Sequence, residues 1–129
     1  MGAHLLLLHL TGRKSGRAIT IPVAYRPVEG GQLLVLTNSL WRLNLRDRPG
    51  VEVTYRGVRR PAAAELVEDP HAVAQVYDAL IREVGHAKAG RRMGIRINVD
   101  RAPTLDELRV AARREGLSLV YIDLDGESR

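Results

Sequence analysis

The sequence predicts an α+β fold built on a small antiparallel β-barrel, and three observations point to it. The first half of the chain is a succession of short apolar or alternating runs separated by glycines, which is typical of strands. The second half carries two amphipathic helical patterns before a last apolar run. The chain has 129 residues, of which 45% are hydrophobic, and this is enough to form one hydrophobic core. We therefore expect one domain over residues 1–124 and a tail at 125–129.

About six strands are expected, each bounded by glycine, proline or polar residues. Pro22 lies inside the second of them, and a proline is tolerated there only at a sheet edge or a bulge. Glu29–Gly31 reads as a turn. The expected strands cover residues 4–11, 18–26, 32–38, 51–57, 59–67 and 117–124.

Two helices are expected in the second half, each with its own start signal. Asp69 is a candidate N-cap with Pro70 at the first helical position, and an apolar stripe at helical spacing follows as far as Gly85. Thr104 and Glu107 have the spacing of a capping box and open a helix that runs to Gly116. The barrel strands therefore come first, and we expect these helices to pack outside them.

The composition removes several classes of function. The chain has no cysteine, so disulfides, thiolate nucleophiles and cysteine-based metal sites are excluded. The four histidines show no metal-ligand spacing, and neither Ser15 nor Ser39 has identifiable triad partners. No apolar run approaches a membrane span or a secretion signal, so a cytoplasmic protein is expected.

The segment "TGRKSGR" at residues 11–17 places three cations and one hydroxyl between and beside two glycines. Phosphate or carboxylate is the natural guest of such a turn, because glycines let backbone N–H groups form a concave nest and cationic side chains match the oxygens. It is not a Walker A loop, since Lys14 and Ser15 precede Gly16 instead of following it. A solvated cationic hairpin turn is the alternative from the residues alone.

Four pieces in order carry a family resemblance: "LTGRKSGR", the strand with Pro22, "LWRLNL" and "VEVTYRG". Together, over residues 5–66, they resemble the deazaflavin-dependent nitroreductase family. These proteins are split β-barrel oxidoreductases related to FMN-binding pyridoxamine-phosphate-oxidase-like barrels. The resemblance implies a split β-barrel and an enzyme that uses the deazaflavin coenzyme F420, with FMN as the alternative cofactor.

The resemblance also implies roles for particular residues. In that family the Gly-Arg-Lys-Ser/Thr-Gly turn grips the phosphate and acidic tail of F420, the Trp-x-x-Asn-Leu helix lies near the deazaflavin ring, and the strand end "LTNS" lines the ring edge. The cofactor-binding residues so implied are Gly12, Arg13, Lys14, Ser15, Gly16, Arg17, Thr37, Asn38, Ser39, Trp41 and Asn44. Trp41 is equally well a core residue.

The sequence also departs from the family pattern. A family arginine is replaced by Ile19, a tyrosine after the tryptophan is replaced by Arg42, and the often aromatic segment after the long helix reads differently at residues 85–103. Phosphate anchoring is therefore expected to be retained, while the substrate pocket is redrawn.

The resemblance implies hydride transfer to an electron-poor small molecule of the quinone, enone or nitroaromatic type. It assigns no catalytic residue, and water or a hydroxyl such as that of Tyr25 would donate the proton. A non-catalytic binder on the same fold and a homodimer stay open. A nucleic-acid-binding module is the remaining rival, disfavoured because the strands lack interleaved aromatics. Its support is the net charge of +5 and the cluster Lys88, Arg91, Arg92, Arg96 and Arg101.

Overall fold

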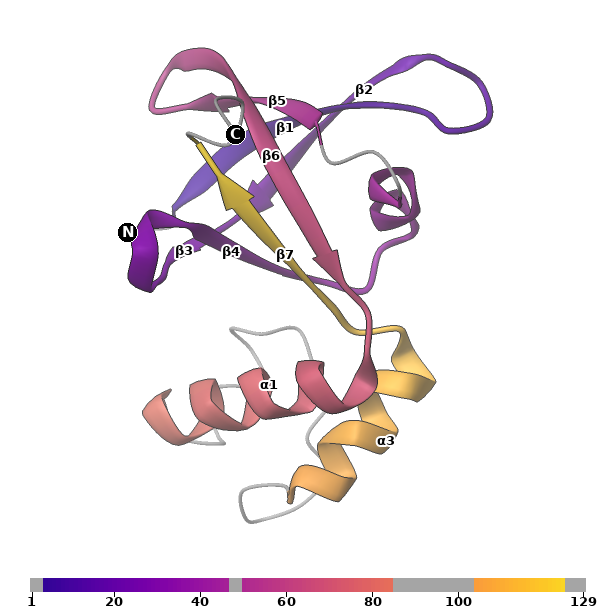
Figure 1. The fold of residues 1–129 in the computed structure, drawn as a ribbon, viewed down its shortest axis with the longest axis vertical. Coiled ribbons are helices and arrows are strands. Elements are labelled where there is room, and N and C mark those ends of the chain that lie inside the picture. Colours follow the sequence, from indigo (N-terminus) through magenta and orange to yellow (C-terminus); the bar gives the residue numbers. More distant parts are fainter. Residues whose placement is uncertain (1–3, 47–49, 85–103, 125–129) are drawn as a thin grey trace. The chain divides into compact units, whose positions relative to one another are not determined.

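The computed structural model describes residues 4–46, 50–84 and 104–124, which form two compact units (Figure 1). One unit holds Met1–Leu66 and Leu119–Arg129, and the other holds Val67–Ser118. The expected tail at 125–129, Gly85 and the basic cluster within 85–103 lie outside the described residues.

The first unit is a curled antiparallel sheet that confirms the α+β split-barrel class, with seven strands in place of about six. The strand order is β2-β1-β5-β6-β7-β4-β3. Short 3₁₀ segments, η1 (Glu29–Gly31) and η2 (Leu40–Leu45), flank β4. The strands are β1 (Leu5–Thr11), β2 (Ala18–Ala24), β3 (Arg26–Pro27), β4 (Leu33–Thr37), β5 (Gly50–Tyr55), β6 (Val58–Val67) and β7 (Ser118–Asp123).

The additional strand arises because the expected strand 18–26 divides at Tyr25. The Tyr25 N–H still donates to the carbonyl of His4 at 2.9 Å, on the β1 side. The next residue, Arg26, already pairs with Leu34 of β4. Since β2 and β3 stand at opposite ends of the strand order, the sheet has to curl until its two edges approach, and β2 and β4 are in contact. Pro22 lies on the edge strand β2, as predicted.

Alternation along the central strand β1 divides the sheet into an inner and an outer face. Leu6, Leu8 and Leu10 are buried in the core, while Leu5, Leu7, His9 and Thr11 point to the other face. Strand β1 pairs with β2 over its whole length, from Leu5 opposite Ala24 to Thr11 opposite Ala18. The 12–17 turn is therefore the hairpin connection at the end of the best-paired part of the sheet.

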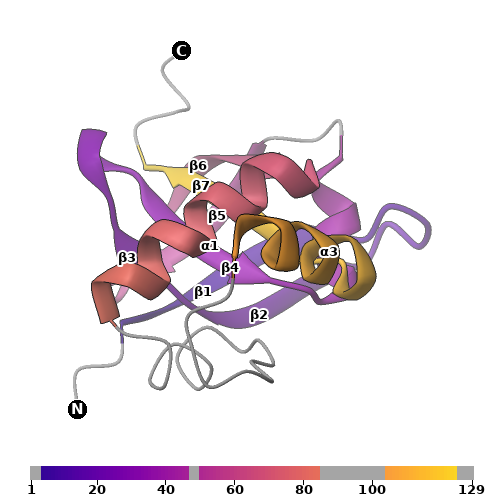
Figure 2. The same ribbon diagram turned by 90° about the horizontal axis from the view of Figure 1, so that it is seen from below.

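The second unit contains α1 (Pro70–Val84) and α3 (Leu105–Glu115), which pack against each other (Figure 2). Both start signals are confirmed: the Ala72 N–H donates to the Asp69 carboxylate at 3.0 Å, and Thr104 begins a complete capping box. Gly116 ends α3 in the left-handed conformation with φ 68°. Burial, together with the nearby Glu115 carboxylate, raises the pKa of the Tyr77 hydroxyl. None of the described helices is long and apolar enough to span a bilayer.

Candidate functional site

The turn between β1 and β2 is closed by its own hydrogen bonds. The Gly12 N–H donates to the Arg17 carbonyl at 2.8 Å, and the Gly16 N–H donates to the Gly12 carbonyl at 2.9 Å. The Arg17 N–H donates to Ser15 Oγ at 3.1 Å. Gly16 has φ 71°, a left-handed conformation that favours glycine. The turn is thus closed by hydrogen bonds within the protein, without a contribution from a ligand.

Gly12 is needed for a second reason, because there is no room for a side chain at that position. It is buried, and a Cβ built on its backbone would lie 2.7 Å from Ser15 Oγ. Since Ser15 Oγ already accepts the Arg17 N–H, it cannot move away without breaking the turn. The first glycine of the motif thus permits the packing inside the turn.

The three cations of the turn are exposed and uncompensated. Within the described parts of the chain, no ion pair or side-chain hydrogen bond engages the charged groups of Arg13, Lys14 or Arg17. The backbone N–H groups of Gly12, Arg13, Gly16 and Arg17 already have partners inside the protein. An anion at this turn therefore has the side-chain cations as its main donors, and less of a backbone nest than the sequence predicts.

The strand end "LTNS" leads directly into η2 and is fixed by short hydrogen bonds. The Ser39 N–H donates to Thr37 Oγ1 at 3.0 Å. Arg42, which stands where the family pattern has a tyrosine, donates from one terminal nitrogen to the carbonyls of Asn38 and Ser39 at 3.2 and 2.9 Å. The side chains of Asn38 and Ser39 remain exposed, while Thr37 is half-buried. This segment is thus held by a residue that sequence reasoning recorded only as a departure.

Trp41 and Asn44 lie on η2, which ends at Leu45 and has 3₁₀ geometry. Trp41 is half-buried and packs against the core of the sheet unit. Asn44 Oδ1 accepts the Arg13 N–H at 2.8 Å, and Asn44 Nδ2 donates to the Trp41 carbonyl at 3.0 Å. The structure therefore joins the cationic turn to the tryptophan-bearing segment, although 31 residues separate Arg13 from Asn44 in the chain.

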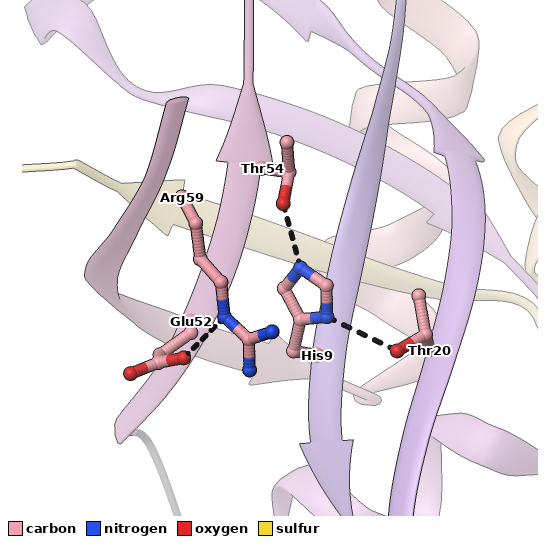
Figure 3. Close-up of polar contacts among 5 residues, drawn as sticks. All are labelled: His9, Thr20, Glu52, Thr54 and Arg59. Atoms are coloured by element: carbon pink, nitrogen blue, oxygen red, sulfur yellow. Dashed lines mark hydrogen bonds and ion pairs between the residues drawn. The ribbon is translucent and has the colours of Figure 1, made fainter. Parts of the chain in front are cut away.

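A cleft of about 680 Å³ lies on the sheet unit beside this turn, and sequence reasoning did not find it. Figure 3 shows His9 of β1 between Thr20 Oγ1 of β2 at 3.1 Å and Thr54 Oγ1 of β5 at 2.8 Å. Nearby, Arg59 Nε donates to a Glu52 carboxylate oxygen at 2.7 Å. The lining residues are His9, Leu10, Thr11, Ala18, Ile19, Thr20, Asn44, Gly50, Val51, Glu52, Arg59 and Pro61.

Strand register is the signal that would have revealed the polar side chains of this cleft. His9 stands opposite Thr20 on one side and opposite Glu52 on the other, so all three share the outer face. Both ring nitrogens of His9 are already used by threonine hydroxyls. His9 therefore links three strands and offers no ring nitrogen to a ligand.

Tyr25 lies at the far end of β2 from the turn. Seven residues of extended strand separate it from Ala18, a span of about 23 Å. Its ring packs on Tyr55 with centroids 5.6 Å apart, and burial, with added contributions from Tyr55, raises the pKa of the Tyr25 hydroxyl. Tyr25 is therefore remote from the cationic turn.

The model of the F420H2-dependent quinone reductase family matches residues 1–100, which include the turn, the "LTNS" segment and η2. The protein belongs to that family. The resemblance seen in the sequence is thus confirmed, and the family is one of oxidoreductases that use reduced coenzyme F420. A comparison with curated protein sequences gives no match.

Solved structures agree on the fold. A pyridoxamine 5′-phosphate oxidase-related FMN-binding protein from Nostoc punctiforme PCC 73102 is 16% identical, with a TM-score of 0.58 over 95% of this chain and 70% of its own. A structure described as a domain-swapped dimer is 16% identical, with a TM-score of 0.51 over 95% and 82%. An F420-H2-dependent reductase, FDR-A, is 18% identical, with a TM-score of 0.48 over 91% and 92%. At these identities the first two structures support the split-barrel fold alone, and nothing is inferred from the third.

The residues of the turn fit the anionic part of coenzyme F420. A phosphate needs cationic donors without competing partners, and the three turn cations meet that condition within the described residues. The turn is preformed, and Gly12 keeps its interior free of a Cβ. The donor set is thus suited to a phosphate and to the carboxylates of an acidic tail.

Proposed function

We propose that this protein uses reduced F420 to reduce an electron-poor small molecule of the quinone, enone or nitroaromatic type, and that the 12–17 turn holds the coenzyme's phosphate and acidic tail. When bound, the reduced deazaflavin supplies the hydride. The chain's own part is to bind and orient, which is what proteins mainly contribute in cofactor-dependent redox chemistry. No side chain is assigned to catalysis, and water remains the simplest proton donor.

The observation that carries this proposal is a hydrogen-bonded turn, linked to the Trp41 segment, whose three cations have no ion-pair partner among the described residues. Arg13 and Lys14 are proposed to bind the phosphate, and Arg17 the acidic tail. Gly12, Ser15 and Gly16 keep the turn in shape. Because these cations have no ion-pair partner among the residues that the structure describes, anion binding there breaks no ion pair within that part of the chain.

The "LTNS" segment and Trp41 are proposed to line the ring. Asn38 and Ser39 present exposed polar side chains, and Thr37 lies half-buried at the end of β4. Trp41 already packs one part of its ring against the core, so the remaining part is proposed to face the deazaflavin. The segment is fixed by Arg42, which supports a ring edge of constant shape.

FMN is the alternative cofactor, because it offers a phosphate to the same cations. An FMN-binding protein shares the fold at a TM-score of 0.58, which supports the barrel but does not select the cofactor. F420 carries carboxylates beyond its phosphate and FMN does not. A turn whose three cations have no ion-pair partner within residues 4–46, 50–84 and 104–124 is therefore better matched to F420.

The test is a titration of the full-length apoprotein with F420 and, separately, with FMN, following the fluorescence of Trp41. The chain has one tryptophan, so the signal has one source. We expect saturable quenching by F420 at micromolar concentrations and weak or no quenching by FMN. Quenching by FMN alone would indicate an FMN-dependent reductase in place of an F420-dependent one. No quenching by either would leave a solvated turn and overturn the proposal.

A charge-matched control is available on the other unit. Arg113 on α3 is exposed and, within the described residues, has no ion-pair partner. Arg113→Gln lowers the net charge as much as Lys14→Gln does. If the turn is the binding site, Lys14→Gln should weaken F420 binding about tenfold or more and Arg113→Gln should not. Equal effects would indicate a general charge effect instead of a site.

We also propose that the protein forms a homodimer through the outer face of β1. Leu5 and Leu7 lie next to each other on that face and are 60% and 39% exposed, and neighbouring exposed apolar side chains are candidates for an interface. Light scattering on the wild type and on Leu5→Thr/Leu7→Thr tests this. A dimer in the first and a monomer in the second is expected, and a monomeric wild type would contradict it.

A further inference from the structure

Both polar atoms of the Asn44 side-chain amide form hydrogen bonds with backbone groups. Its Oδ1 accepts the Arg13 N–H at 2.8 Å and its Nδ2 donates to the Trp41 carbonyl at 3.0 Å. The partners fix which atom is oxygen and which is nitrogen, because one is a donor and the other an acceptor. Asn44 is also half-buried. Its polar atoms are therefore directed at the protein itself.

The link from Asn44 to Arg13 differs in kind from the other bonds of the turn. The bonds from Gly12, Gly16 and Arg17 all close the turn onto itself. They fix its shape but not its direction relative to the neighbouring segments. Among the described residues, the Arg13–Asn44 bond is the hydrogen bond that ties the turn to an element outside its own hairpin. It therefore restrains the direction in which the turn points.

Arg13 is the first cation of the turn, so a restraint on its backbone acts on the anion-binding group next to it. A guanidinium that starts from a fixed backbone loses less freedom when it binds an anion than one on a swinging loop. The same amide holds Trp41 by its carbonyl. One side chain thus keeps the cations and the tryptophan in a constant relation.

We infer that Asn44 is a positioning residue: it orients the cationic turn, through the Arg13 backbone, for anion binding, and makes no contact with the anion itself. This inference rests on the proposed anion-binding function of the turn. It replaces the role of direct cofactor contact that the family resemblance implies for Asn44. It requires that removal of the amide weaken anion binding although every cation is still present.

Two variants separate the two hydrogen bonds. Asn44→Leu has nearly the same shape and removes both. Asn44→Asp keeps an oxygen for the Arg13 N–H and removes the donor to the Trp41 carbonyl. Because the aspartate also adds a negative charge near the cations, Thr11→Asp is the control for charge: Thr11 is exposed at the end of β1, borders the same cleft and has no part in the Asn44 bonds.

The first measurement is the affinity of each full-length variant for inorganic pyrophosphate and for F420, by calorimetry at low salt and at about 0.5 M salt, where charge effects are screened. We expect Asn44→Leu to bind both about tenfold more weakly. At high salt Asn44→Asp should match Thr11→Asp. If Asn44 instead touches the anion, Asn44→Asp should stay much weaker than Thr11→Asp at high salt, and the inference would be wrong.

The second measurement is hydrogen exchange at the Arg13 amide, which does not depend on any ligand. The amide should be protected in the wild type and in Asn44→Asp, and exchange faster in Asn44→Leu. Wild-type affinity and protection in Asn44→Leu would overturn the inference. If Asn44→Leu does not fold, the comparison of Asn44→Asp with Thr11→Asp still decides. A wild type that binds neither pyrophosphate nor F420 contradicts the proposed function itself, which is a different outcome.

Discussion

The 12–17 turn and the neighbouring His9 cleft are both polar, but they differ in what their polar groups contact. In the cleft, both ring nitrogens of His9 are bonded to threonines and Arg59 is paired with Glu52. In the turn, Arg13, Lys14 and Arg17 have no such partners within the described residues. Both regions contain cationic or titratable side chains, and composition alone does not tell them apart.

The difference shows how to separate a binding site from a structural polar cluster. Groups that are already hydrogen-bonded to each other stabilise the sheet and would have to break those bonds to bind a ligand. Groups that are fixed in place but unpaired keep their full capacity for an anion. We therefore expect substitutions in the turn to change affinity and substitutions in the cleft to change stability.

The largest effect is expected for the double substitution Arg13→Ala/Lys14→Ala. Removing two charge-assisted interactions should weaken F420 binding by about a hundredfold or more, because each contributes roughly 1.5–3 kcal/mol. The free energy of unfolding should stay the same, since neither side-chain cation has a partner in the described part of the chain. Trp41 quenching and denaturant unfolding measure the two quantities. Unchanged affinity would remove the distinction between the turn and the cleft.

Gly12→Ala should lower both the free energy of unfolding and the affinity for F420. The new Cβ would meet Ser15 Oγ at 2.7 Å and disturb the bond that Ser15 makes to the Arg17 N–H. A loss of about 1–3 kcal/mol in unfolding free energy is expected, together with weaker F420 binding. Gly50→Ala is the matched control, because nothing lies within 4 Å of a Cβ there. If both glycines tolerate alanine equally, the packing account of Gly12 fails.

His9→Ala should lower stability and leave affinity alone. It removes the hydrogen bonds to Thr20 and Thr54, and the loss of both should lower the free energy of unfolding by about 1–2 kcal/mol. Chemical denaturation measures the loss, and Thr54→Val should reproduce about half of it. A large loss of F420 affinity in His9→Ala, with the protein still folded, would place His9 in the binding site after all.

The smallest effect is expected for Arg59→Gln. The ion pair with Glu52 is exposed, with side chains 62% and 50% accessible, and such pairs contribute only about 0.2–1 kcal/mol. F420 affinity should change less than twofold. A loss comparable to that of Lys14→Gln would show that the cleft shares the anion with the turn.

Much of the fold could be predicted because its signals are local. The helix starts at Asp69 and Thr104 follow from caps whose donors and acceptors lie within three residues of each other. Pro22 indicated an edge strand for an equally local reason, the missing N–H. The division of the second strand at Tyr25 was not predicted, because it depends on which strands its two sides find as partners.

The candidate site also has one part that the sequence predicted and one part that it did not. The turn cations were found from sequence because glycines and cations are adjacent in the chain. The His9 cleft was missed because His9, Thr54 and Arg59 meet only through strand pairing. The single-domain expectation over residues 1–124 remains a prediction, and so do the binding roles of the turn residues 12–17 and of Thr37, Asn38, Ser39 and Trp41.

The sequence by itself determined the α+β class, most of the strands, both helix starts and the position of the anion-binding candidate in the first hairpin. It did so because spacing, caps and glycine conformations act over a few residues. Only the tertiary structure decided which charges are left unpaired and that Asn44 reaches the Arg13 backbone from 31 residues away. Those facts depend on contacts between segments far apart in the chain: η2 brings the Asn44 amide to the Arg13 N–H, and the pairing of β5 with β6 brings Arg59 to Glu52.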